Sequence, residues 1–123
     1  LQAYERSVLF LERISPENLI PRCEGSGKDL WFFHTQLQME IRAEYEHNFS
    51  QQLYVSDQAW SELVKAKDQV LALINQAAGE LTPQSTGVDL GRKVLGKMMQ
   101  GQTPPTHEAI RKLKSEMAKA LQG

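Results

Sequence analysis

Apolar residues recur along this chain at the three- and four-residue spacing of amphipathic α-helices, and strand-type alternation is absent. The spacing predicts helices over residues 1–14, 16–20, 30–52, 57–78, 88–100 and 106–121. The two long helices, 30–52 and 57–78, are predicted to pack antiparallel as the centre of an all-α bundle, with the shorter helices at their flanks.

Residues typical of helix ends support these boundaries. Ser15, Asp29 and Ser56 stand immediately before three of the predicted helices, where a side-chain oxygen can accept a bond from a free backbone N–H. Pro21 is predicted to end the 16–20 helix, and Gly79 is predicted to terminate the 57–78 helix.

The first long helix carries polar residues within its apolar stripe. His34 and Asn48 project along the same face as Phe33 and Ile41. A buried polar group without a hydrogen-bond partner costs on the order of 1–3 kcal/mol. We therefore expect His34 and Asn48 to bond to backbone or partner groups and fix helix register, the alternative being that they line a ligand site. The residues predicted to be buried are Phe33, Leu37, Ile41, Trp60, Val64 and Leu71.

The same helix is apolar on a second side. Phe32 and Met39 project away from the main stripe, and helices of this kind are central in a bundle or pack against a partner. A second contact is therefore expected here, with the first helix or with another protein, which can be a second copy of the chain. Arg42 and Glu46 lie nearby at the i, i+4 spacing of a helical ion pair.

Length and charge indicate one domain, 1–123, with 1–81 as its main body and 82–123 as a C-terminal helical extension. A glycine- and proline-containing break at 101–105 precedes the last predicted helix. The body has 7 Lys/Arg and 12 Asp/Glu, whereas the extension has 7 Lys/Arg and 3 Asp/Glu. The basic residues of the extension can pair with acidic residues of the body or contact anionic lipid. The single cysteine, Cys23, excludes an internal disulfide and is typical of a reducing compartment.

Enzyme chemistry has one candidate motif. Glu44 and His47 form Glu-x-x-His, the spacing at which a carboxylate and an imidazole share a metal in helical-bundle enzymes. Those enzymes need the motif twice, and the sequence contains it once. Zinc-type cysteine and histidine sets, calcium loops and phosphate-binding glycine loops are missing. The sequence therefore indicates no catalytic residue and no cofactor, with a metal-dependent enzyme as the alternative.

Nucleic-acid binding is the second alternative. It rests on six basic residues in the C-terminal part of the chain: Lys93, Lys97, Arg111, Lys112, Lys114 and Lys119. No aromatic residue lies among them and the net charge is −1, so the pattern does not favour this function.

Three segments carry a family resemblance: LQAYERSVLFLERISPENL at the start of the chain, IRAEYEHNFSQQLYVS over 41–56, and the pairs AW at 59–60 and IN at 74–75. The chain resembles an uncharacterised family of Bacteroidota proteins, strongly over residues 1–81 and weakly over 82–123. The resemblance implies a single N-terminal transmembrane helix, a basic linker and then this helical domain, with no established activity.

The opening of the chain fits an upstream anchor, because the first helix begins at Leu1 without a methionine or a capping residue. We therefore expect a piece of a longer protein, anchored in the inner membrane with this domain in the cytoplasm. The expected function is that of a non-enzymatic interaction or scaffold domain that binds another protein or a second copy.

Overall fold

The computed structural model describes residues 1–100 and 104–122, and within them it contains helices and no strand. The predicted all-α class is confirmed, while residues 101–103 of the predicted break lie outside the described part. The elements are α1 (Gln2–Ile14), α2 (Pro16–Cys23), α3 (Leu30–Asn48), a 3-10 helix η1 (Phe49–Tyr54), α4 (Asp57–Gly79), α5 (Gly87–Met98) and α6 (Pro105–Gln122).

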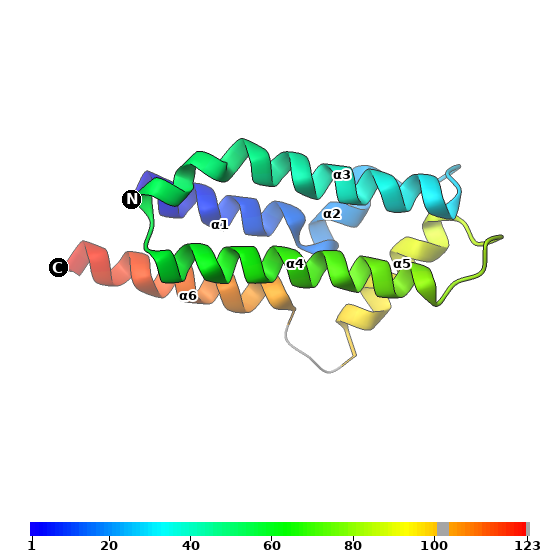
Figure 1. The fold of residues 1–123 in the computed structure, drawn as a ribbon. Helices are drawn as coiled ribbons and strands as arrows, with labels where there is room; N and C mark the ends of the chain where they lie inside the picture. Colours follow the sequence, from blue (N-terminus) through cyan, green and yellow to red (C-terminus); the bar gives the residue numbers. More distant parts are fainter. Residues whose placement is uncertain (101–103, 123) are drawn as a thin grey trace.

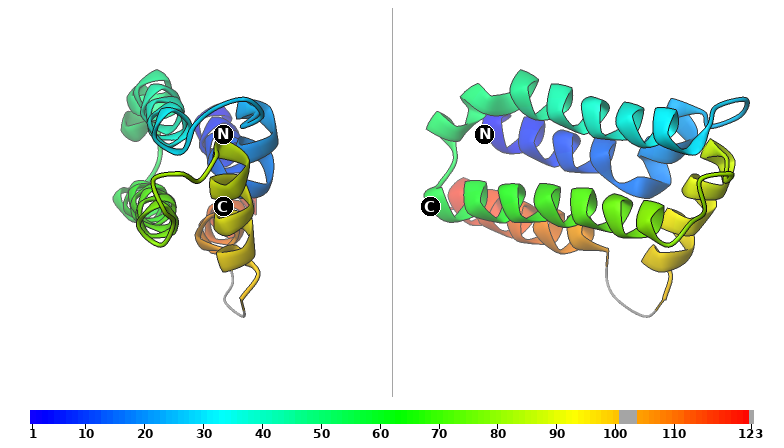
Figure 2. Two further views of the ribbon diagram at one scale, coloured as in Figure 1. Left: turned by 90° about the vertical axis from the view of Figure 1, so that its right-hand side faces the viewer. Right: turned by 45° about the vertical axis from the view of Figure 1, so that its right-hand side comes forward.

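Four helices, α1, α3, α4 and α6, run side by side, and neighbouring helices point in opposite directions (Figure 1). The long helices α3 and α4 form the antiparallel pair that the sequence predicts. Helix α6 lies against both α4 and α1, so the four helices surround one core (Figure 2). The short helices α2 and α5 lie at the end of the bundle opposite to the two termini (Figure 1).

Two of the three predicted caps are confirmed. Asp29 Oδ1 accepts a hydrogen bond from Phe32 N at 2.7 Å, and Ser56 Oγ accepts one from Ala59 N at 3.0 Å. Ser15 stands at the cap position of α2, but its hydroxyl donates to the Leu11 carbonyl instead. Ser15 thus marks the start of α2 correctly, although its side chain bonds to the preceding helix and not to α2.

Three helices end at residues other than the predicted ones. Pro21 lies inside α2, which continues to Cys23, because in so short a helix proline removes one backbone bond while the buried residues on either side keep their packing. Gly79 is the last residue of α4 and has no left-handed backbone. Helix α3 ends at Asn48 rather than residue 52, since Asn48 Nδ2 donates to the Glu44 carbonyl and the backbone tightens into η1.

The core is a single cluster to which every α-helix contributes. Four of the six residues predicted to be buried are buried: Phe33, Leu37, Ile41 and Trp60. The prediction is wrong for Val64 and Leu71, which are half-buried at the margin of the core. The centre of the α4 stripe is occupied instead by Leu63, Ala66, Val70 and Ile74.

Helix α6 is joined to the N-terminal part of the chain by polar as well as apolar contacts. The buried hydroxyls of Ser15 and Thr106 share a hydrogen bond, and His107 Nε2 lies 2.8 Å from Glu17 Oε1. Leu113 is buried in the same cluster as the residues of α1 and α3. The segment after residue 82 therefore contributes to the common core.

Candidate interaction surface

The outward side of α3 carries large apolar side chains that are open to solvent. Phe32 is 60% exposed and Met39 is 63% exposed, although α3 also contributes four buried residues to the core. They border a shallow hollow, here called the outer α3 face, lined by Lys28, Phe32, Thr35, Gln36, Met39, Glu40 and Ala43. The second apolar side of this helix is thus directed to solvent rather than into the packing with α1.

Apolar residues on the outer α3 face follow helical spacing. Phe32, Met39 and Ala43 are separated by seven and four residues, which places them in one row along the helix. Side chains in such a row can pack into the groove of another helix.

Lys28 is held at one end of this face. Its Nζ donates to the Cys23 carbonyl and to Gln36 Oε1, both at 2.7 Å, and lies 5.7 Å from the centre of the Phe33 ring. The loop that carries Lys28 is fixed in turn, because Gly87 N donates to the Lys28 carbonyl at 2.8 Å. The ammonium group therefore has a defined position beside the row of apolar side chains.

The close approach of two loops explains how Lys28 is placed. A Cβ atom on Gly87 would lie 2.8 Å from the Gly25 carbonyl oxygen, and one on Gly25 would lie 2.9 Å from the Gly87 carbonyl carbon. Only glycine permits this contact at both positions. The loop before α3 is consequently pressed against the start of α5.

His34 joins α3 to α4 at the margin of the core. Its Nε2 lies 2.8 Å from Asn75 Oδ1, which also accepts a bond from Gln38 Nε2. Trp31 packs edge-on against the His34 ring, with 5.4 Å between ring centres. His34 is half-buried, and its contacts are those of a helix-to-helix link.

The Glu-x-x-His pair is separated by the fold. Glu44 Oε1 lies 2.6 Å from Arg13 Nε of α1, with 14% of the glutamate side chain exposed, whereas His47 is exposed. Asn48 is half-buried and bonds to the Glu44 carbonyl of its own helix, and Arg42 is exposed. In residues 1–100 and 104–122, no three histidine, cysteine or acidic side chains come together as a metal site would require.

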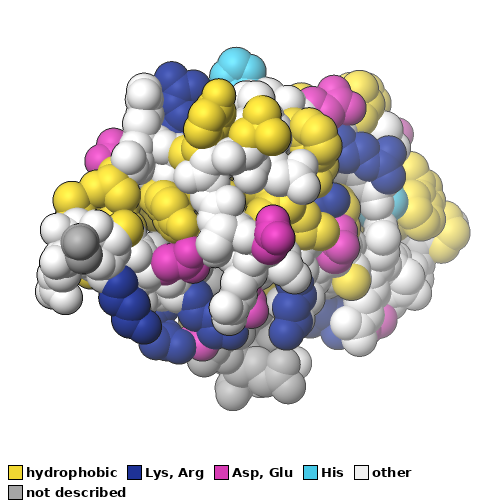
Figure 3. Space-filling model, turned by 60° about the vertical axis from the view of Figure 1, so that its left-hand side comes forward, with side chains coloured by type: hydrophobic (Ala, Val, Ile, Leu, Met, Phe, Trp, Pro, Cys, Tyr) yellow, Lys and Arg dark blue, Asp and Glu magenta, His cyan; other side chains and the backbone are white. Residues whose placement is uncertain are grey.

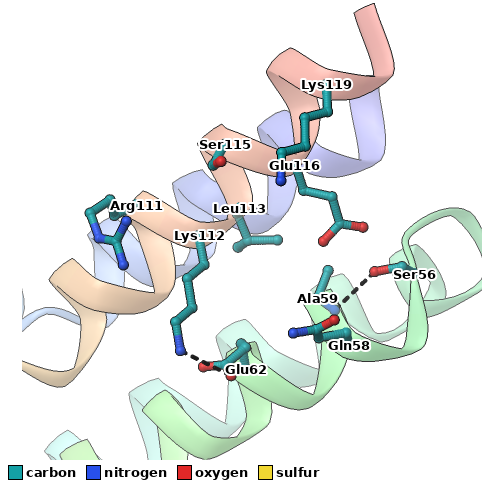
Figure 4. A pocket seen from close by; sticks show the side chains of 10 residues that line it. All are labelled: Ser56, Gln58, Ala59, Glu62, Arg111, Lys112, Leu113, Ser115, Glu116 and Lys119. Atoms are coloured by element: carbon teal, nitrogen blue, oxygen red, sulfur yellow. Dashed lines mark hydrogen bonds and ion pairs between the residues drawn. The ribbon is translucent and has the colours of Figure 1, made fainter. Parts of the chain in front are cut away.

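A groove between α4 and α6 is the second hollow of interest (Figure 4). Its walls carry charges that already pair within the chain: Lys112 Nζ lies 3.3 Å from Glu62, and Tyr4 donates to Glu116 at 2.8 Å. Arg111 pairs with Glu108 at 2.6 Å. These pairs leave the groove without a dominant charge.

Most of the basic residues considered as candidates for nucleic-acid binding likewise form ion pairs within the chain. Lys97 and Lys93 lie 2.6 and 3.5 Å from the Glu80 carboxylate. With Arg111 and Lys112, four of the six basic residues therefore have acidic neighbours. Three of these pairs join different parts of the chain, and the Arg111–Glu108 pair lies within α6.

The end of the bundle that carries η1 and both termini has a mixed surface. Figure 3 shows hydrophobic side chains in several separate places, with charged side chains of both signs between them. Leu53 and Tyr54 of η1 and Leu121 of α6 are among the exposed residues. These exposed residues come from different elements, whereas Phe32 and Met39 lie on one helix. No helix in the described residues is long and apolar enough to cross a membrane.

Comparison with known proteins gives one result. A family model described as "Family of unknown function (DUF7935)" matches residues 1–120. The chain belongs to this family. The match extends into α6, and the expectation of a family without an assigned function is confirmed. No curated protein and no solved structure matches the chain.

Within this DUF7935 domain, the structure gives contacts to two residues, Lys28 and Asn75, for which the sequence predicted no role. Lys28 belongs to the segment GSGK, which resembles the end of a phosphate-binding loop and lacks its other elements. Asn75 lies on α4 without any local signal of its bond to His34. Both roles depend on contacts between segments far apart in the sequence.

Proposed function

We propose that this domain is a non-enzymatic interaction module that binds another protein through the outer α3 face. The observation that carries the proposal is the exposure of Phe32 and Met39 in one row, bordered by the positioned ammonium of Lys28. Aromatic residues and methionine are enriched at the centres of protein interfaces. Burying such side chains is also the main source of association free energy.

The ion pair of Glu44 with Arg13 supports this function over the metal-dependent alternative. The Glu44 carboxylate is paired with Arg13 at 2.6 Å, whereas His47 is exposed, so the two side chains of the motif do not share one environment. The pairing of Lys93, Lys97, Arg111 and Lys112 with acidic neighbours likewise supports an interaction module over a nucleic-acid-binding domain.

The proposal includes the placement that the family resemblance implies: a Bacteroidota protein with an N-terminal transmembrane helix and this domain in the cytoplasm. The buried, unpaired Cys23 supports a reducing compartment. Contact of the basic segment 82–123 with anionic lipid is part of the same proposal. Topology reporters fused after Gly123 in the full-length gene test it, and a periplasmic signal would contradict it.

The test of the interaction itself uses the full-length protein purified from its own membrane. We expect the protein with the natural sequence to co-purify with a second protein at stoichiometric yield. The double variant Phe32→Asp, Met39→Lys should no longer recover that second protein. Leu53→Lys is the matched control, because it introduces a charge at an exposed apolar residue of η1. Equal recovery from the double variant would overturn the proposal. Stoichiometric metal that disappears with Glu44→Gln would favour the enzyme alternative.

A further inference from the structure

We draw no further inference here: the strongest candidate, the exposed apolar surface patch of the outer α3 face, is the surface already described, and nothing in the structure shows which partner covers it.

Discussion

Replacement of Leu113 by alanine should destabilise the whole domain, although the residue lies only ten positions from the C-terminus. Leu113 is 1% exposed and belongs to the cluster that contains the buried residues of α1, α3 and α4. Removing a fully buried leucine side chain costs its transfer free energy and leaves a cavity, about 3 kcal/mol in total. For a domain of this size that loss lowers the midpoint of thermal unfolding by about 12 °C.

Leu121→Ala is the matched control, because the same substitution is made on the same helix at a residue that is 69% exposed. Its effect should stay within about 0.5 kcal/mol. Urea unfolding followed by the helical dichroism signal measures both variants, and we expect one cooperative transition for each. Equal stability of Leu113→Ala and Leu121→Ala would refute the reasoning that α6 is part of the common core.

Three further outcomes follow from the contacts described above. Burial raises the pKa of the Cys23 thiol, so alkylation near pH 8 should be much slower in the folded protein than in urea. The Lys97 ammonium holds the pKa of Glu80 below its ordinary value. The ion pair therefore stabilises the folded protein at neutral pH, and this contribution is lost as the pH falls through the lowered pKa. In urea unfolding measured across pH, Glu80→Gln should reduce the loss of stability on the acid side. Gly87→Ala should destabilise by about 1–3 kcal/mol because its Cβ would meet a backbone oxygen, whereas Gly79→Ala, with open space around it, should be neutral or stabilising in thermal unfolding.

The helices themselves were predictable because each helix buries one apolar face, and the residues of that face recur at three- and four-residue spacing in the sequence. Asp29 and Ser56 marked their helix starts correctly for the same local reason. The differences have two causes: packing that outweighs a local rule, and a side chain that bonds to the backbone of its own helix. Pro21 stays within α2 because buried neighbours hold the helix, and Asn48 ends α3 through a bond to Glu44.

The candidate surface was predictable only in part. The exposure of Phe32 and Met39 follows from their position opposite the main stripe, but whether α1 covers them depends on how the helices pack. The bonds of His34 to Asn75 and of Glu44 to Arg13 join segments 41 and 31 residues apart. Such pairings have no signal in the spacing of residues along a single helix.

The most direct test of the interaction surface is photo-crosslinking in the native membrane, with a benzoylphenylalanine placed at Met39 of the full-length protein. We predict a discrete crosslinked product from this position and none from the same probe placed at Leu53, which is the more exposed residue. A product with twice the mass of the chain identifies the second copy. Absence of a product from Met39, or equal products from both positions, would contradict the assignment of the outer α3 face as the binding surface.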